Sequence, residues 1–237
     1  MSAFSRSSTG ISVVQHFSSL INGNIIVITG PSANSIGAET AISLAHASPS
    51  IILLAGRSEA KISPVIKEIH TLNPSITTHF VPLDLASQKS IRQAASLINS
   101  LVERIDILIN NAGVMAVPAY QTTEDGIELQ FGCNHIGHFL LTNLVLEKLL
   151  KAGREGQARI VNVSSTGYEL GGVQFDDWNF NEGKNYDPWQ AYAQSKTANV
   201  LFSSTLATRL KDRNIQSFAL QPGCEFFEIL FKRTINY

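Results

Sequence analysis

Tyr192 and Lys196 are the residues of this 237-residue chain whose types and spacing most directly suggest chemistry. They lie in PWQAYAQSKTANVLF, residues 188–202, which we expect to be helical, and residues four apart project from one face of a helix. An ammonium group beside a phenol favours the phenolate. We therefore expect Lys196 to lower the pKa of Tyr192, so that Tyr192 can donate and accept protons near neutral pH. A Tyr-x-x-x-Lys pair also arises by chance, and a surface helix with one half-buried aromatic ring is the alternative.

The elements that must position this pair are strands that alternate with helices. Strands with apolar residues on both faces are typical of parallel sheets covered by helices on both sides. We therefore expect an α/β, Rossmann-like doubly wound parallel sheet that binds its ligands at the carboxyl ends of the strands. Apolar, β-branched runs predict strands at 24–29, 50–55, 76–83, 105–109, 158–164 and 215–220. Composition and periodicity predict helices at 36–45, 58–72, 87–102, about 125–151 and around Tyr192.

Composition and charge limit the classes of function. Hydrophobic residues make up 44% of the chain and can fill one large core. The formal net charge of −1, with no run of like charges, is not typical of proteins that bind nucleic acid or anionic membranes, so we expect small-molecule partners. Two cysteines, Cys133 and Cys224, indicate neither a disulfide framework nor a thiolate metal site and are consistent with a reducing, cytoplasmic location.

The N-terminal segment is predicted to be a docking helix. Two polar residues interrupt its apolar stretch, Ile11–Leu20, which is too short and too polar for a membrane span or a signal peptide. Ser8 and Thr9 are candidate caps for this helix. We expect residues 1–237 to form one dinucleotide-binding domain in which residues 1–22 contribute this docking helix.

A loop of small residues, 29–37, follows the first predicted strand and leads into a helix. Backbone N–H groups and the helix dipole favour an anion at such a position, and small side chains let phosphate oxygens approach. The loop is therefore a candidate pyrophosphate site, although a glycine turn after a strand is the alternative. The candidate contacts are Gly30, Ser32, Ser35, Ile36 and Gly37.

These motifs, in their order and approximate spacing from residue 24 to Gly223, resemble the short-chain dehydrogenase/reductase family. The stretch FGCNHIGHFLLTN, residues 131–143, resembles a subgroup that includes retinol dehydrogenases and related carbonyl reductases. The family's phosphate loop reads T-G-x-x-x-G-x-G. This chain has one extra residue there and Ser35 in place of the middle glycine. Ser35 can hydrogen-bond a phosphate, and Asn34 tolerates the left-handed conformation that a glycine would otherwise supply.

The resemblance implies roles for four residues in catalysis. Tyr192 would transfer a proton and Lys196 would bind the nicotinamide ribose. The serine in the family's catalytic position corresponds to Ser165, which would bind the substrate carbonyl oxygen, and Ser164 is the rival assignment. Asn134, beside an apolar stripe on its predicted helix, would hold a water that connects the lysine to solvent as a proton relay. Its alternative role is a satisfied core asparagine.

The resemblance also implies where the cofactor binds. The second predicted strand ends with no carboxylate to bind a ribose 2′-hydroxyl. Arg57 stands there instead and suits a 2′-phosphate, which favours NADP over NAD, although a solvated surface charge is the alternative. The remaining family contacts would be Asp84 and Leu85 at the adenine, the N-N-A-G element Asn110, Asn111, Ala112 and Gly113, and the turn Pro222 and Gly223.

Other side chains near these motifs are given roles in packing or in the substrate pocket. The apolar stripe beside Asn134 consists of Leu129, Cys133, Ile136, Leu140 and Leu144. His135 and His138 lack metal-ligand spacing, so we expect no metal site and interpret both as packing or surface groups. The long segment between Ser165 and Tyr192 carries aromatic residues that could form an apolar pocket wall, namely Phe175, Trp178, Tyr186 and Trp189.

After Gly223 the resemblance stops. The family continues with a nicotinamide contact, a helix and a seventh strand, whereas residues 224–237, CEFFEILFKRTINY, match none of these. We expect a truncated or alternatively spliced product that lacks the last of the usual seven strands and leaves an uncovered sheet edge at its last strand.

The sequence as a whole predicts an NADP-dependent oxidoreductase that interconverts a carbonyl and an alcohol on a small apolar substrate. A non-catalytic or defective NADP-binding protein is the alternative, because of the atypical tail and the altered phosphate loop. An extended epimerase-type relative shares Tyr-x-x-x-Lys, but the chain is too short for the substrate domain of that class. We expect no nucleic acid and no membrane span, and we leave a homo-oligomer open.

Overall fold

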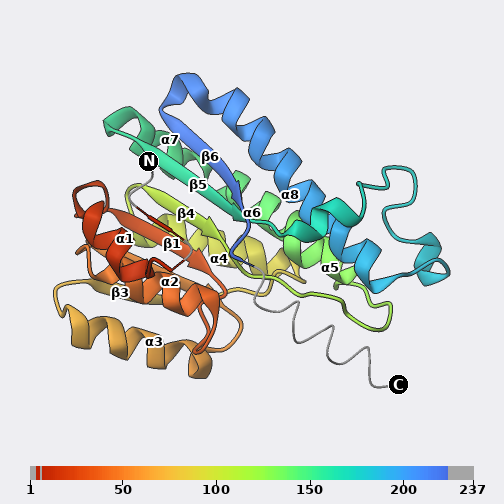
Figure 1. The fold of residues 1–237 in the computed structure, drawn as a ribbon, viewed down its shortest axis with the longest axis horizontal. Coiled ribbons are helices and arrows are strands. Elements are labelled where there is room, and N and C mark those ends of the chain that lie inside the picture. The colour runs from red at the N-terminus through yellow and green to blue at the C-terminus, as the bar shows by residue number, and fades with distance from the viewer. Residues whose placement is uncertain (1–3, 6, 224–237) are drawn as a thin grey trace.

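One six-stranded parallel sheet forms the centre of the computed structural model, which describes residues 4, 5 and 7–223 (Figure 1). The strand order is β3-β2-β1-β4-β5-β6, so the chain direction across the sheet reverses between β1 and β4. This is the doubly wound arrangement predicted from the alternating pattern, and the prediction is confirmed. The strands are β1 (Ile25–Thr29), β2 (Ile51–Gly56), β3 (Thr77–Pro82), β4 (Ile107–Asn110), β5 (Ala158–Val163) and β6 (Ile215–Leu220). The predicted tail, 224–237, lies outside the described residues.

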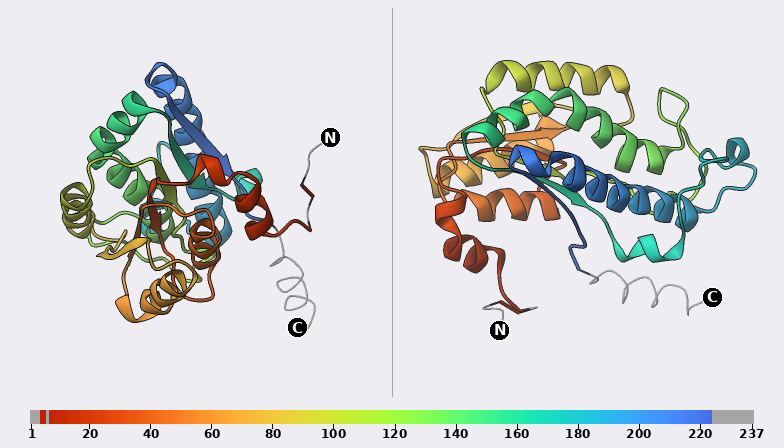
Figure 2. Two further views of the ribbon diagram at one scale, coloured as in Figure 1. Left: turned by 90° about the vertical axis from the view of Figure 1, so that its left-hand side faces the viewer. Right: turned by 90° about the horizontal axis from the view of Figure 1, so that it is seen from above.

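Helices cover both faces of the sheet (Figure 2). Successive residues of a strand point to opposite faces, so Val27 packs with α4, α6, α7 and α8 on one side, and Ile26 with α1, α2 and α3 on the other. This double burial explains why the strands read as continuous apolar runs. The helices are α1 (Gly10–His16), α2 (Ile36–Ala45), α3 (Glu59–Leu72), α4 (Gln88–Leu101), α5 (Leu129–Phe131), α6 (Gly137–Leu144), α7 (Leu146–Glu155) and α8 (Pro188–Leu210).

The predicted docking helix is α1, which packs against α2. Its N-cap is Thr9, whose side chain accepts a hydrogen bond from the Ser12 N–H, as one of the two candidate caps predicts. Val14 is its buried residue and joins the core on the α2 side of the sheet. The N-terminal segment thus extends one of the two helical layers.

The predicted continuous helix at 125–151 is wrong in its extent. The carboxylate of Glu128 accepts hydrogen bonds from the N–H groups of Gln130 and Phe131, and this cap begins the helix at Leu129. A π-helical turn, Gly132–Ile136, then adds one residue before α6, and Val145 separates α6 from α7.

This helical segment also buries residues other than those predicted. The predicted apolar stripe is only partly buried, and the inward-facing positions include Phe131, Asn134, His138, Leu141 and Val145. The buried series follows the predicted stripe by one or two residues at every step, and this offset begins at Phe131, before the π-helical turn. Asn134 therefore lies on the buried face rather than beside it.

The sheet edge at β6 is open among the residues that the structure describes. On the α2 side, β5 and β6 are covered by no described helix, and Phe218 and Leu220 are 44% and 40% exposed. A cavity of about 430 Å³ lies there between this face of the sheet and the segment around Phe17 and Leu20. The predicted uncovered edge at the last strand is therefore present within residues 7–223.

Candidate active site

Helix α8 presents Tyr192 and Lys196 side by side at the carboxyl edge of the sheet. Asp187 caps the helix by accepting hydrogen bonds from the N–H groups of Trp189 and Gln190. The Lys196 ammonium lies 5.5 Å from the centroid of the Tyr192 ring, and both side chains are buried. The two residues share one helix face, as their spacing predicts.

Ser165, the second residue after the end of β5, lies beside Tyr192. Its hydroxyl hydrogen-bonds the Tyr192 phenol and also accepts the Gly167 N–H at 3.1 Å. A Cβ atom on Gly167 would lie 2.7 Å from the Tyr192 ring, so glycine lets this turn approach the phenol. Ser164, in contrast, is buried and donates its hydroxyl to the backbone oxygen of Lys196 at 2.9 Å. Ser165 rather than Ser164 therefore contacts the phenol.

The predicted lowering of the Tyr192 pKa is wrong in this structure. Burial raises the pKa of Tyr192, and the hydrogen bond from Ser165 offsets only part of that rise. Burial also lowers the pKa of Lys196 to about 8, while its ammonium donates to the Val163 backbone oxygen at 2.9 Å. Desolvation opposes the charged form of both groups and outweighs their mutual effect. At neutral pH the phenol therefore carries its proton.

Asn134 is fully buried, with its side-chain amide held on both sides. Its Oδ1 accepts the Val114 N–H at 2.8 Å, and its Nδ2 donates to the Val114 oxygen and to the Ser195 hydroxyl, both at 2.9 Å. A Cβ atom on Gly113 would lie 3.0 Å from Asn134 Oδ1 and 3.7 Å from the Lys196 ammonium, so the three residues converge. The amide thus joins the loop after β4 to α8.

A cavity of about 400 Å³ extends from the end of β1 to the end of β3, where a dinucleotide is expected. Gly30 has a φ of 70°, and a Cβ atom there would lie 2.9 Å from Ala112. At Gly37 a Cβ atom would lie 2.5 Å from the Asn111 side chain. Both glycines therefore allow the phosphate loop to pack against the loop after β4. The predicted contacts that line this cavity are Gly30, Ser32, Ser35, Ile36, Gly37, Arg57, Asp84, Leu85, Asn111, Ala112 and Gly113.

The two positions at which the phosphate loop departs from the family pattern, Asn34 and Ser35, behave differently. Asn34 adopts the predicted left-handed conformation, with a φ of 63°. The Ser35 hydroxyl caps α2, because it accepts the Ala38 N–H at 3.1 Å and donates to the Gly30 oxygen at 3.3 Å. This hydroxyl is already bonded within the protein, so an anion here would rely on the N–H groups of the first helical turn.

The two asparagines of the N-N-A-G element tie neighbouring strands together. Asn111 donates its side-chain N–H to the Thr29 oxygen at 2.8 Å. Asn110 donates to Thr142 at 3.0 Å and to Asn162 at 2.8 Å. Asn110 is buried beneath the strand ends and is not among the residues that line the cavity. Asn110 therefore supports the strand ends and does not border the cavity, unlike the contact that was predicted.

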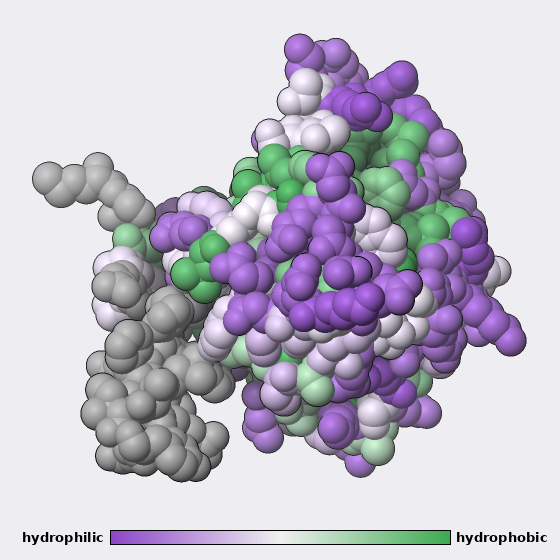
Figure 3. All heavy atoms as spheres, turned by 90° about the vertical axis from the view of Figure 1, so that its right-hand side faces the viewer, coloured by the Kyte–Doolittle hydropathy of each residue, from purple (hydrophilic) through white to green (hydrophobic). Residues whose placement is uncertain are grey.

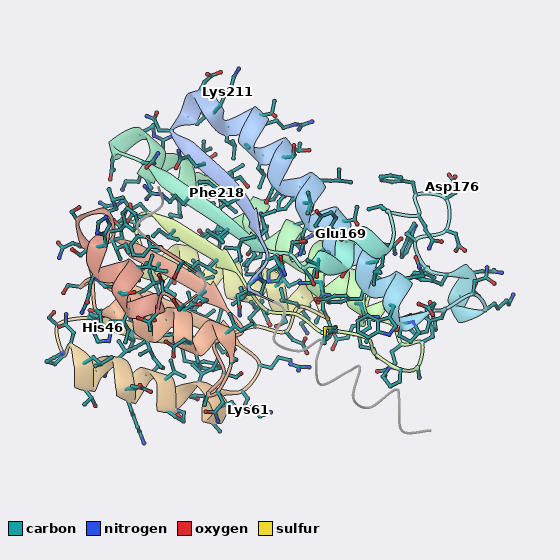
Figure 4. The ribbon with its side chains drawn as sticks, viewed as in Figure 1. His46, Lys61, Glu169, Asp176, Lys211 and Phe218 are labelled. Carbon is teal, nitrogen blue, oxygen red and sulfur yellow. The ribbon has the colours of Figure 1, made fainter. Side chains whose placement is uncertain are left out.

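Two polar residues of the cavity mouth, Ser58 and Lys61, were missed by sequence reasoning. Lys61 lies one helical turn after Arg57, a spacing that could have indicated it. Figure 4 labels it at the N-terminal end of α3. Its backbone oxygen accepts the Ala33 N–H at 2.8 Å, which anchors α3 to the phosphate loop. Ser58 precedes α3, but its hydroxyl does not cap the helix. Arg57, Ser58 and Lys61 thus form a cationic and hydroxyl-bearing rim.

A second cavity, of about 230 Å³, opens beside Tyr192 and is bounded by Met115, Leu170 and Trp189. The predicted turn residues Pro222 and Gly223 line it as well. Trp189 is the one member of the predicted aromatic wall that borders this cavity. Its apolar walls and its hydroxyl groups suit a mainly apolar molecule with one polar group.

The other aromatic residues of the predicted wall do not border this cavity, so the wall is divided between two cavities. Phe175 and Trp178 border a cavity of about 500 Å³ on the outer side of α6 and α8. Tyr186 donates to the Val117 oxygen at 2.7 Å and accepts from Gln130. These bonds attach Tyr186 to the segments around Val117 and Gln130. Figure 4 labels Asp176 in the same segment, 171–187, which extends away from the sheet. Figure 3 looks at this end of the molecule, where hydrophobic surface lies between hydrophilic side chains.

The described residues contain no group of three or more His, Cys, Asp or Glu side chains arranged to hold a metal ion. Cys133 borders the cofactor cavity, where burial raises the pKa of its thiol to about 12. Among the same residues, no helix combines the length and the apolar character that crossing a bilayer requires.

Comparison with known proteins identifies relatives of most of the chain. The short chain dehydrogenase family model matches residues 24–177. Human retinol dehydrogenase 13 is 46% identical over 205 residues, which are 86% of this chain and 59% of that protein. The chain spans about three fifths of the length of the retinol dehydrogenases that it matches.

Solved structures share the fold. An uncharacterised protein from Mycobacterium paratuberculosis has a TM-score of 0.73 and 37% identity, over 89% of this chain and 72% of that chain. The Pseudomonas aeruginosa RhlG/NADP active-site complex has a TM-score of 0.67 and 25% identity, over 85% of this chain and 73% of that chain.

Proposed function

The chain belongs to the short-chain dehydrogenase/reductase family, and on that premise we propose that it is an NADP-dependent oxidoreductase that interconverts a carbonyl and an alcohol. The observation that carries this proposal is the convergence of Ser165, Tyr192 and the buried Lys196 on one cavity, with the Lys196 ammonium 5.5 Å from the centroid of the Tyr192 ring. Two hydroxyl groups held together can bind one carbonyl oxygen and pass a proton to it.

In the reducing direction, Tyr192 is the proton donor. The raised pKa of Tyr192 keeps its phenol protonated at neutral pH, so the proton is available for the substrate oxygen. Ser165 donates to the same oxygen and orients it. NADPH, when bound, supplies the hydride to the carbonyl carbon, and hydride plus proton give the alcohol. In the oxidising direction Tyr192 must first release its proton, so that the phenolate can accept the proton of the alcohol.

Lys196 and Asn134 serve the proton supply. The pKa of about 8 lets Lys196 exchange a proton near physiological pH, and its position beside the Tyr192 ring suits that exchange. In the proposed relay, a water bonded to Asn134 connects Lys196 with solvent. The convergence of Gly113, Asn134 and Lys196 supports this assignment.

The proposed substrate is apolar, with one carbonyl or hydroxyl group. Met115, Leu170 and Trp189 surround the cavity beside Tyr192, and exposed Met115 and Leu170 offer apolar contact at its mouth. The similarity to retinol dehydrogenase 13 supports the same class, since its name specifies a long apolar alcohol.

We propose NADP rather than NAD as the cofactor because of the rim formed by Arg57, Ser58 and Lys61. Two cations and a hydroxyl suit a 2′-phosphate, and no carboxylate stands at this strand end to bind a free 2′-hydroxyl. The solved RhlG/NADP complex is a relative with this cofactor.

A non-catalytic NADP-binding protein is the second candidate. The observation that favours it is the Ser35 hydroxyl, which is engaged in capping α2 and in a bond to the Gly30 oxygen. A weakened pyrophosphate site could bind cofactor without supporting efficient turnover.

One experiment separates the two candidates. Purified protein is titrated with NADPH and NADH by tryptophan fluorescence and then assayed with a panel of apolar aldehydes, retinal among them, against a polar sugar aldehyde. Selective oxidation of NADPH with the apolar aldehydes supports the reductase. NADPH binding without turnover of any aldehyde refutes it and supports the second candidate.

We also propose a homo-oligomer and a cytoplasmic location. A homo-oligomer would use the apolar surface between α6 and α8, where Phe139 and Leu201 are 46% and 48% exposed. Light scattering after size exclusion tests this, and a monomer at all concentrations contradicts it. A cytoplasmic location is tested by cell fractionation.

A further inference from the structure

His138 connects the end of β1 to the backbone of Asn134. It lies in the first turn of α6, one turn after Asn134, and is 2% exposed. Its Nδ1 lies 2.9 Å from the Asn134 backbone oxygen, and its Nε2 lies 2.9 Å from the Thr29 hydroxyl. Both ring nitrogens are thus engaged, one on the Asn134 side and one on the side of the phosphate loop.

The neighbouring bonds determine where each proton lies. The Thr29 hydroxyl oxygen accepts the N–H groups of Asn111 and Ala112, both at 3.0 Å. Two accepted bonds occupy its lone pairs, so its own O–H is left to donate to His138 Nε2. The proton of the neutral imidazole then sits on Nδ1 and donates to Asn134, whose carbonyl can only accept.

The surroundings keep His138 neutral. A proton on Nε2 would face a hydroxyl whose lone pairs are already used. Burial lowers the pKa of His138 to about 4, and the nearby Lys196 on α8 and His135 on the π-helical turn act in the same direction. The directional chain from Thr29 through His138 to Asn134 therefore persists across the physiological pH range.

The two ends of this series of hydrogen bonds, Thr29 and Asn134, contact the cofactor cavity and the catalytic groups respectively. Thr29 holds the backbone of Asn111 and Ala112, which border the cofactor cavity. Asn134 holds Val114 and Ser195, and Ser195 in turn donates to the Tyr192 backbone oxygen at 2.7 Å. The Asn134 carbonyl lies in the π-helical turn, where the regular helical bonding pattern is interrupted.

We propose that His138 is a positioning residue that sets the Asn134 turn relative to the N-N-A-G loop and α8, and thereby the geometry of the catalytic groups. The role in turnover rests on the proposed reductase function, whereas the coupling between the two segments does not. A buried histidine with only a packing role is the competing explanation.

Three substitutions of His138 remove the bond to Asn134, the bond to Thr29 or both. In His138→Asn the side-chain amide N–H can replace Nδ1–H and keep the bond to Asn134. In His138→Gln the longer amide reaches towards Thr29 but no longer presents a donor at the Nδ1 position. His138→Leu loses both bonds. Leu141→Ala is the matched control, because Leu141 is fully buried on the same helix and its truncation destabilises the fold without touching either bond.

The variants are compared at equal folded fraction, by kcat, KM for NADPH and for an apolar aldehyde, and amide hydrogen exchange over residues 111–116. Misplacement of the catalytic groups lowers kcat by ~10- to 100-fold in His138→Leu, His138→Asn and His138→Gln, because each of them loses at least one of the two bonds. Leu141→Ala keeps kcat within about threefold of wild type. Exchange over residues 111–116 rises in the three His138 variants and not in Leu141→Ala. If His138→Leu does not fold, the Asn and Gln variants carry the comparison.

Three possible results decide between the positioning role of His138 and the reductase function. Wild-type kcat and wild-type exchange in both His138→Asn and His138→Gln would overturn the positioning role. An active wild type whose kcat is unchanged in His138→Leu would also overturn it and leave the reductase function intact. An inactive wild type would overturn the reductase function alone, because the exchange pattern still decides whether His138 couples the two segments.

Discussion

Replacing Tyr192 by phenylalanine removes one oxygen atom and tests the proposed proton donor. The ring should stay in place, because its packing against Gly167, its 6.3 Å centroid distance to Trp189 and its 5.5 Å distance to the Lys196 ammonium do not involve that oxygen. The loss to stability is one hydrogen bond with Ser165. Such a bond contributes about 1 kcal/mol, so the Tm should fall by about 2–4 °C.

The loss to catalysis should be much larger. Removal of a positioned general acid costs ~10²- to 10⁴-fold in turnover, or about 3–5 kcal/mol of transition-state stabilisation. The Kd for NADPH should change by less than about tenfold, or about 1.4 kcal/mol, because the phosphate loop and the Arg57 rim are far from the change. Turnover is followed by NADPH absorbance with an apolar aldehyde, and binding by fluorescence titration.

Tyr168→Phe is the matched control. It makes the same chemical change on a tyrosine that is 44% exposed and follows Ser165 in the chain. This variant should keep wild-type turnover. If Tyr192→Phe retains more than about a tenth of the wild-type kcat, Tyr192 is not the general acid and the reasoning is refuted.

Three further predictions concern the groups around Tyr192 and the cofactor rim. Lys196→Met should raise Tm at about pH 7 by removing a buried ammonium with a pKa of about 8, worth about 3 kcal/mol. Wild-type stability rises with pH from about 8 to 10.5, because the unfolded lysine binds the proton more tightly, so melting at about pH 10 should show a smaller difference. Arg57→Ala and Lys61→Ala should each weaken NADPH binding about tenfold and leave NADH unchanged in fluorescence titrations, and an equal loss for both cofactors would contradict the 2′-phosphate site. Ser165→Ala should lower kcat ~100-fold, whereas Ser164→Ala should mainly lower Tm, and the reverse pattern would exchange their roles.

The apolar runs predicted the sheet well, because a strand that is buried on both faces is apolar at nearly every position. The helix around Asn134 was less predictable. Whether a turn is α-helical or π-helical depends on packing and on the Glu128 cap, and neither is visible in the spacing of apolar residues. Asn134 and His138 lie on the buried face, one or two residues away from the apolar stripe that the sequence suggested.

The Tyr192 pKa shows a second limit of sequence reasoning. Two residues four apart on a helix predict a charge effect, and that effect favours the phenolate. Burial acts on each group separately and has the opposite sign for Tyr192. The degree of burial is decided by segments remote in sequence, such as the turn at Gly167 that covers the ring.

The sequence by itself determined the order of the elements and pointed to the proposed reactive groups, because strand burial, Tyr-x-x-x-Lys and the N-N-A-G element are local patterns. Only the tertiary structure decided which serine meets Tyr192, that Lys61 joins Arg57 at the cavity rim, and that His138 links Thr29 to Asn134. The physical reason is that these contacts depend on how separate elements approach one another in space. Thr29 and His138 are 109 positions apart in the chain and 2.9 Å apart in the fold.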